Sequence, residues 1–271
     1  MIGMRHGLQR LVIGCVALAA AIAPAAESRG DTGVAWRTIA PDLETTTLSA
    51  GPLSAKLVVV RSTLQRYRLG VVESQAFGTS RSTVRRLVEA SGAIVGINAN
   101  FFDTEGRALG LVVSDGVVRQ RLHGGGRTLT GVFAIDKNGP KIEGRIAYAP
   151  AGVTEAVQAG PRLIVNGVPS TGLSTSGASS RRAGVCVDDA GRVLLFAVSS
   201  GLLGLTLQEF QNLLMQRDLK CRDALNLDGG GSVQLSVVPG VVPGGLKTAE
   251  IFIPGADEVP VMLGLFPLKS P

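Results

Sequence analysis

Short apolar runs separated by turn residues fill the middle of the chain and predict antiparallel β-structure. Four pairs of runs enclose turns rich in Gly, Asn or Asp, at Asp115-Gly116, Asn138-Gly139, Asn166-Gly167 and Asp188–Gly191. These residue types tolerate the backbone angles that short hairpin turns require, so each pair of runs predicts a β-hairpin.

A first stretch with apolar residues at helical spacing leads into a short buried strand. The predicted helix begins at a cap on Ser80 or Ser82, ends near Ser91 and precedes the strand Ala93–Ile97. A polar segment, Asn98–Asp103, follows this strand directly.

A second stretch has the same order of helix, buried strand and polar loop. Its helix begins at the capping box Thr206-x-x-Glu209, ends near Leu219 and precedes the strand Ala224–Leu227. If the two buried strands are neighbours in one sheet, the residues that follow them meet at one edge, where sites in open α/β sheets lie. The side chains expected there are Asn98, Asn100 and Asp228.

The remaining stretches complete an expected α+β fold, with a mixed, largely antiparallel β-sheet core flanked by a few helices. Lys56–Val60 and Leu69–Val72 predict two strands that could form a hairpin, while Ile251–Ile253 and Val261–Leu265 predict one or two edge strands. The Ser/Gly/Thr-rich stretch Pro169–Ser180 predicts a surface loop, which is either a lid or a connection without a role.

Residues 1–25 are expected to be a cleaved secretory signal peptide, with an uncleaved N-terminal anchor as the alternative. Arg5 and Arg10 precede the apolar run Leu11–Ala23. That run is shorter than the roughly 20 residues that a membrane span needs. We therefore expect a periplasmic or secreted protein with no stable membrane span after signal removal.

The rest of the chain is expected to form one large domain after a short lead. Residues 26–55 are Thr-rich, have weak periodicity and contain Trp36 as their large apolar anchor, so they predict a loose N-terminal segment. Residues 56–271 carry the strong patterns and are expected to form the domain.

Charge argues against a nucleic-acid partner. Removing Arg5 and Arg10 from the 27 basic residues leaves 25 against 21 acidic ones, a net charge near +4. The basic residues are scattered, and aromatic side chains for base stacking are few. Anionic envelope polymers or phosphorylated sugars suit this mild basic excess better.

Two cysteines, Cys186 and Cys221, remain after signal removal. In an oxidising compartment they could form a disulfide, or they could be two separately buried thiols. Neither a Cys-x-x-Cys motif nor a His/Cys cluster indicates zinc, because His123 is the only histidine beyond the signal.

The stretch Ala224–Ser232 delivers a single carboxylate, Asp228, to a turn of three glycines. Glycines let a ligand approach the main chain closely, and their N–H groups could face an anion. The alternative is a hairpin or bulge turn that needs glycine for its backbone angles. The absence of a following Gly-Lys-Ser/Thr argues against a phosphate-binding P-loop.

Five motifs in order, between about Ile94 and Val237, resemble the phosphodiester glycosidase family. They are Asn98–Asp103, Gly106 with Leu109–Gly116, Ala159–Gly167, Arg182 with Asp188–Phe196, and Ala224–Ser232. The resemblance implies an exported hydrolase that cleaves a glycosyl phosphodiester in cell-envelope or exopolysaccharide metabolism, with residues 56–271 as its domain. A non-catalytic module that binds envelope polysaccharide or a partner protein through the same cleft is the alternative.

The resemblance also assigns roles to residues. Cleavage of a sugar-1-phosphodiester passes through an oxocarbenium-like transition state, and the phosphate is already a good leaving group. Asp228 is then the catalytic carboxylate, Arg182 holds the phosphate, and Asn98 contacts sugar hydroxyls or orients Asp228. The expected substrate-binding residues are Asn100, Phe102, Asp103, Gly160, Asn226, Gly229, Gly230, Gly231 and Ser232.

Nothing in the sequence requires a cofactor. A divalent cation held by Asp228, Asp103 and the Asn side chains is compatible with these oxygen ligands. An esterase built on Ser232 and His123 is the weakest alternative, because the sequence has no Gly-x-Ser-x-Gly elbow.

Overall fold

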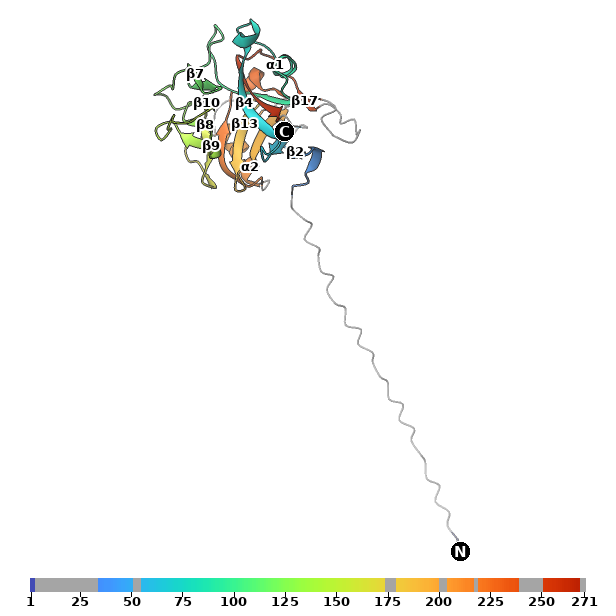
Figure 1. Cartoon of the computed structure of the whole chain (residues 1–271). Helices are drawn as coiled ribbons and strands as arrows, with labels where there is room; N and C mark the ends of the chain where they lie inside the picture. The colour runs from blue at the N-terminus through green and yellow to red at the C-terminus, as the bar shows by residue number, and fades with distance from the viewer. Residues whose placement is uncertain are drawn as a thin grey trace. The chain divides into compact units, whose positions relative to one another are not determined.

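Three antiparallel sheets make up the unit Gly33–Pro271 (Figure 1) in its described residues. The computed structural model describes residues 1–2, 34–50, 55–173, 179–199, 204–216, 219–238 and 251–268. The expected signal peptide lies almost wholly outside these residues, as does the centre of the expected Pro169–Ser180 loop.

The largest sheet has eight strands and includes both predicted hairpins around Asn166-Gly167 and Asp188–Gly191. In sheet order its strands are β1 (Arg37–Ala40), β2 (Leu43–Ser49), β3 (Lys56–Ser62), β14 (Val193–Ser199), β13 (Ala183–Asp188), β15 (Cys221–Asn226), β11 (Arg162–Val165) and β12 (Val168–Pro169).

The other two sheets have five strands each, and the hairpins at Asp115-Gly116 and Asn138-Gly139 are confirmed in the first of them. Its order is β7 (Val117–Gln120), β6 (Val112–Ser114), β10 (Glu155–Ala159), β8 (Gly131–Asp136) and β9 (Gly139–Gly144). The second has the order β17 (Ile251–Ile253), β16 (Leu235–Val237), β5 (Val95–Asn98), β18 (Val261–Pro267) and β4 (Tyr67–Glu73).

Apolar residues on both faces of the strands build a layered core. In β3, Val58 and Val60 belong to the cluster shared with β5 and β18, while Leu57 and Val59 pack with helix α2 (Leu207–Gln216). Helix α1 (Val84–Ser91) packs in the same way on the outer face of the sheet that contains β5. The two sheets therefore face each other, and each has a helix on its outside.

Both helices connect strands that run in the same direction but are separated by a third strand. β18 lies between β4 and β5, and β13 lies between β14 and β15. Every strand pair in the described residues is consequently antiparallel, so the expected mixed sheet is wrong and the largely antiparallel core is confirmed. With two α-helices among the described residues, the α+β class fits only roughly this β-rich fold.

Three local predictions need correction. β3 and β4 do not form a hairpin, because they belong to different sheets. β17 is an edge strand as expected, but β18 is interior. The cap of α1 is Thr83, whose hydroxyl accepts from the Arg86 N–H at 3.3 Å, whereas Ser82 is paired with Val259.

The capping box at the start of α2 is confirmed. The Thr206 hydroxyl accepts a hydrogen bond from the Glu209 N–H at 3.1 Å, and the Glu209 carboxylate accepts one from the Thr206 N–H at 2.7 Å. Two backbone donors that the first turn leaves unpaired are satisfied in this way.

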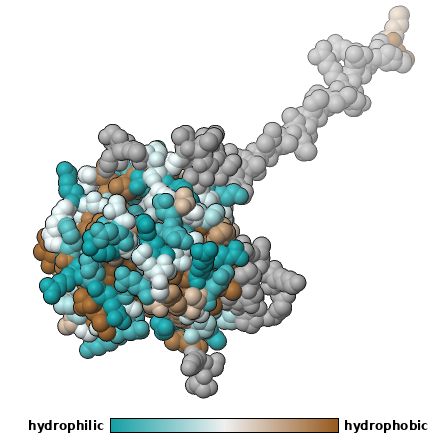
Figure 2. Space-filling model, turned by 90° about the horizontal axis from the view of Figure 1, so that it is seen from above, coloured by the Kyte–Doolittle hydropathy of each residue, from teal (hydrophilic) through white to brown (hydrophobic). Residues whose placement is uncertain are grey.

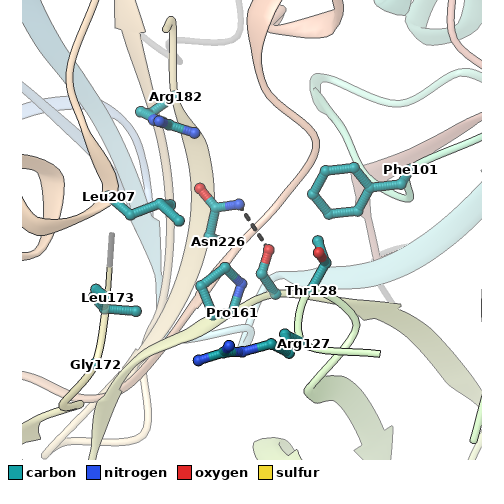
Figure 3. A pocket seen from close by; sticks show the side chains of 10 residues that line it. Phe101, Arg127, Thr128, Pro161, Gly172, Leu173, Arg182, Leu207 and Asn226 are labelled. Carbon is teal, nitrogen blue, oxygen red and sulfur yellow. Dashed lines mark hydrogen bonds between the residues drawn. The ribbon is translucent and has the colours of Figure 1, made fainter. Parts of the chain in front are cut away.

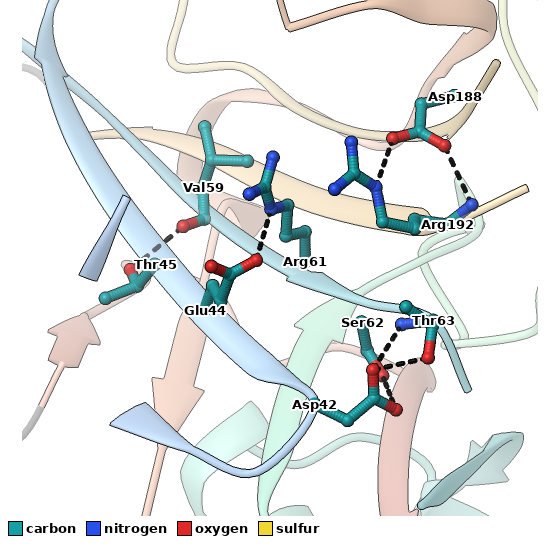
Figure 4. A network of polar contacts seen from close by, with 9 residues as sticks. All are labelled: Asp42, Glu44, Thr45, Val59, Arg61, Ser62, Thr63, Asp188 and Arg192. Atoms are coloured by element: carbon teal, nitrogen blue, oxygen red, sulfur yellow. Dashed lines mark hydrogen bonds and ion pairs between the residues drawn. The ribbon is translucent and has the colours of Figure 1, made fainter. Parts of the chain in front are cut away.

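The segment expected to be loose is part of the largest sheet. It contains β1 and β2, and polar contacts fix β2 to β3 (Figure 4): Glu44 pairs with Arg61 at 2.7 Å, and the Thr45 hydroxyl donates to the Val59 carbonyl at 2.9 Å. Asp42, in the β1–β2 turn, accepts the Thr63 N–H at 3.0 Å. Hydrogen bonds thus hold this segment in the sheet, although its apolar pattern is too weak to predict the strands β1 and β2.

Cys186 and Cys221 form a disulfide, which settles the alternative left open by the sequence. It joins β13 to its neighbour β15 on the face that packs against α2. The strand that leads to Asp228 is therefore covalently attached to the strand that begins after Arg182.

The surface is chemically mixed. On the face shown in Figure 2, hydrophobic residues are scattered among hydrophilic ones. Among the described residues, no helix is both long enough and apolar enough to cross a membrane.

Candidate active site

Asp228 lies at the end of β15, where two sheets meet. Its N–H donates to the Ala99 carbonyl at 3.0 Å, and its carboxylate accepts the Gly229 N–H at 2.9 Å and the Ser232 hydroxyl. Burial raises the pKa of Asp228 to about 6; the two hydrogen bonds oppose this rise, and the negative charge of Asp257 adds to it. Asp228 therefore exchanges its proton close to physiological pH.

Asn98 is brought to Asp228 by a route that the sequence did not predict. The strands β5 and β15 belong to different sheets, so they are not neighbours at one sheet edge. Their ends meet because the two sheets face each other. The Asn98 Nδ2 donates to the Asp228 carbonyl at 2.8 Å, and its Oδ1 accepts the Gln234 N–H at 3.0 Å. Asn98 is fully buried, so it orients the Asp228 backbone and does not reach a ligand.

Replacing Asn98 by Ala is expected to lower the free energy of unfolding by about 2–3 kcal/mol, because it leaves the partly buried Asp228 carbonyl and the buried Gln234 N–H unpaired. Equilibrium denaturation measures this change. Asn138→Ala is the matched control, since Asn138 is exposed in a turn, and its variant should stay within about 0.5 kcal/mol of the parent. Equal stability of the two variants would contradict the role of Asn98.

A pocket of about 500 Å³ adjoins this turn and contains three of the predicted residues (Figure 3): Arg182, Gly160 and Asn226. Asp228 is not among the lining residues. It is connected to the pocket through Gly229, because a methyl group on the Gly229 Cα would lie 3.7 Å from the Arg182 Nη1.

Arg182 is half-buried. Its Nε donates to the Leu205 carbonyl at 2.8 Å. Burial lowers the pKa of the guanidinium, and the nearby negative charge of Glu209 opposes this. Arginine nevertheless stays protonated in proteins, so the group presents a fork of donors to an oxyanion. Arg181 has a different task, because its Nη2 donates to the carbonyls of Val233 (2.9 Å) and Pro254 (2.7 Å).

Asn226 presents a buried acceptor to the pocket. Its Nδ2 donates to the carbonyls of Gly160 (2.9 Å) and Leu227 (2.8 Å), and these two acceptors fix the orientation of the amide. Its Oδ1 is buried without a partner among the described residues. Gly160 is needed here because its φ is +147° and a Cβ would overlap the Thr128 carbonyl.

The three glycines are needed for the geometry of the turn, and two of their N–H groups are already bonded within the protein. The Gly229 N–H is taken by the Asp228 carboxylate, and the Gly230 N–H donates to the Arg181 carbonyl at 3.0 Å. Gly230 has a φ of +63°, and a Cβ on Gly231 would overlap the Asp257 carboxylate. The expectation that these N–H groups face a bound anion is therefore wrong for Gly229 and Gly230.

Three other predicted residues lie away from the pocket. The Asn100 Nδ2 is buried and donates to the carbonyls of Leu111 and Gln158, both at 3.1 Å. The pKa of Asp103 is lowered, first by the hydrogen bond that its carboxylate accepts from the Arg107 N–H and then by its pairing with the Arg107 Nε at 2.8 Å. Phe102 and Asp103 line a separate cavity of about 510 Å³.

The aromatic residue in the pocket is Phe101, the neighbour of the predicted Phe102 (Figure 3). Phe102 packs against the cluster under α1 and pairs with Ala108. Alternation along a strand assigns the two rings to opposite sides, but it does not say which side holds the pocket.

Sequence reasoning missed Asp257. Its N–H donates to the Gly231 carbonyl at 3.0 Å, and its carboxylate packs against Gly231, close enough to Asp228 to raise the pKa of that residue. Asp257 belongs to none of the five motifs, so no sequence signal marked it. Among the described residues, no group of three or more His, Cys, Asp or Glu could hold a metal ion.

Residues 91–266 match the family described as phosphodiester glycosidase. The match covers the turn at Asp228, Arg182 and Asp257. A comparison with curated proteins gives no match.

Several solved structures share the fold, including the two that follow. The catalytic domain of zebrafish N-acetylglucosamine-1-phosphodiester alpha-N-acetylglucosaminidase, auto-inhibited by its pro-peptide, has a TM-score of 0.61 and 19% identity, over 86% of this chain and 86% of that chain. A hypothetical protein from Synechocystis has a TM-score of 0.60 and 17% identity, over 87% of this chain. This chain spans 64% of the length of the Synechocystis protein.

Proposed function

The chain belongs to the phosphodiester glycosidase family, and from this we propose that it hydrolyses a glycosyl phosphodiester into a free sugar and a phosphate monoester. The name of the zebrafish relative describes an enzyme for such a linkage, which supports this substrate class. The observation that carries the proposal is the turn after β15, in which Asp228, a carboxylate of raised pKa, is followed directly by Gly229, whose Cα faces the Arg182 guanidinium.

In the proposed reaction the bond between the anomeric carbon and the phosphate oxygen breaks, and its electron pair goes to the phosphate. The oxygen of water bonds to the anomeric carbon, and the proton of that water is released. The phosphate gains negative charge as it leaves, so Arg182 stabilises the transition state more than the bound substrate. Ionised Asp228 stabilises the positive charge on the sugar, as nucleophile or as a fixed anion.

We also propose that the reaction takes place outside the cytoplasm, in cell-envelope or exopolysaccharide metabolism. The basic and apolar pattern of residues 1–25 supports export. The disulfide between Cys186 and Cys221 supports it independently, since such bonds persist in oxidising compartments.

The test is to offer the purified protein a panel of sugar-1-phosphodiesters that differ in the sugar, and to measure the release of reducing sugar and phosphate monoester. Hydrolysis of one or more members supports the proposal. Binding of these compounds without turnover would contradict it and would favour a non-catalytic binding module.

The acid limb of the pH profile, which is the fall of kcat/KM at low pH, should reflect protonation of the Asp228 carboxylate. Because the ionised form acts, kcat/KM should fall about tenfold per pH unit below a pKa near 6. Asp257→Asn removes a negative charge that helps to raise this pKa, so the limb should move to lower pH. Glu258→Gln is the matched control, because Glu258 is exposed and pairs with Arg86. An unmoved limb in Asp257→Asn would contradict the coupling of the two carboxylates.

A further inference from the structure

Arg127 places a second cation on the wall of the 500 Å³ pocket, and we propose that the aglycone of the substrate carries a second oxyanion that Arg127 binds. Figure 3 shows Arg182 and Arg127 on opposite sides of Asn226 and Pro161. This inference rests on the proposed function, because it defines the substrate of the same site.

The charge of Arg127 is available to a ligand. Its guanidinium makes no ion pair or hydrogen bond with the described part of the chain, and it is exposed at the pocket wall. Arg182 differs, because it donates to the Leu205 carbonyl and is influenced by Glu209. None of the described residues that line the pocket is acidic, so the charge of Arg127 is not neutralised within it.

The backbone around Arg127 is held in place on both sides. The buried Gln158 side chain accepts the His123 N–H at 2.8 Å and donates to the carbonyls of His123 (2.9 Å) and Leu129 (3.0 Å). The Arg145 guanidinium donates to the carbonyls of Gly126 (2.7 Å) and Leu129 (3.2 Å). These bonds fix the backbone of the loop that carries Arg127, so the fold places the root of this side chain at the pocket wall.

The geometry points to the aglycone and not to the sugar. Arg182 lines the pocket and Asp228 does not, so the pocket lies on the phosphate side of the bond that breaks. A substrate with its anomeric carbon at Asp228 and its phosphate at Arg182 extends its aglycone toward the wall that contains Arg127. A guanidinium fork binds a planar carboxylate or a phosphate through paired hydrogen bonds, and both of these groups are oxyanions.

The test compares substrates with one sugar and one phosphodiester but three aglycones: a neutral alcohol, the same alcohol with a carboxylate, and the same alcohol with a phosphate. The parent should show a kcat/KM about tenfold higher for at least one anionic aglycone than for the neutral one, which is the discrimination expected of one charge-assisted contact. The carboxylate and phosphate arms distinguish the two sources of the oxyanion. In Arg127→Gln the ratio of anionic to neutral kcat/KM should fall to about 1.

Arg121→Gln is the matched control, because Arg121 is also exposed, comes from the same loop and does not line the pocket, so its ratio should equal that of the parent. A ratio near 1 in the parent, with the neutral substrate hydrolysed, would overturn the inference and leave the proposed function standing. If no substrate is hydrolysed, the proposed function fails, and calorimetric affinities of non-hydrolysable phosphonate analogues with the same aglycones decide the inference. Equal affinities of the parent for neutral and anionic analogues would then overturn it.

Discussion

Asp228→Asn should lower kcat/KM for a glycosyl phosphodiester by about 10³-fold, which corresponds to about 4 kcal/mol of lost transition-state stabilisation. The amide has nearly the shape of the carboxylate and can still accept the Gly229 N–H, so the turn should keep its structure. It lacks the negative charge that stabilises the developing positive charge at the anomeric carbon. Steady-state sugar release by parent and variant measures the effect.

A matched control separates this charge from general effects on the protein. Asp189→Asn makes the same chemical change in the exposed β13–β14 turn and should leave kcat/KM within about twofold of the parent. Affinity of Asp228→Asn for a phosphonate analogue should also change little, since Arg182 still binds the phosphate. Retention of more than a tenth of the parent activity would exclude Asp228 as the catalytic carboxylate.

The fold was predictable where patterns are local. Each of the four hairpins is specified by a turn dipeptide or tetrapeptide that follows an apolar run, and the capping box Thr206–Glu209 specifies the start of α2. The pairing of distant strands is not specified locally. No feature of residues 261–267 indicates that they lie between β4 and β5, so an interior strand was expected at an edge.

The candidate site was predictable to the extent that motifs carry it. Arg182, Gly160 and Asn226 were expected in the site and do line one pocket, and Asn98 does contact Asp228. Two features of the site could be recognised only in the three-dimensional structure. The choice between Phe101 and Phe102 depends on how the strand end is rotated, and the approach of Asp257 to Gly231 depends on a segment far away in sequence.

The pKa of Asp228 could not be predicted from the sequence because it depends on burial. Its pKa rises to about 6 because two sheets enclose the end of β15, and the hydrogen bonds from Gly229 and Ser232 oppose that rise only in part. A sequence shows that a carboxylate follows a strand. Only the packing of the second sheet, through Asn98 and Ala99, removes it from water.

The double variant Cys186→Ala/Cys221→Ala should have a free energy of unfolding about 4 kcal/mol lower than the parent, because the disulfide closes a loop with a sequence separation of 35. The bridge restricts the unfolded chain, and its removal restores that freedom. Tm should fall by about 8–15 °C for a domain of this size. Denaturant titration and thermal unfolding, each with and without a reductant, measure the effect.

The reductant supplies the control. Reduction should lower the stability of the parent toward that of the double variant and should leave the double variant unchanged, because it has no bond left to reduce. The double variant also tests whether the activity of the site depends on the disulfide. β13 and β15 are paired from Gly184–Asn226 to Asp188–Cys221, with one irregularity next to Asp188. The folded double variant should therefore retain kcat/KM within a few-fold of the parent at low temperature. A stability loss below 1 kcal/mol would show that the unfolded chain is restricted by something other than the disulfide.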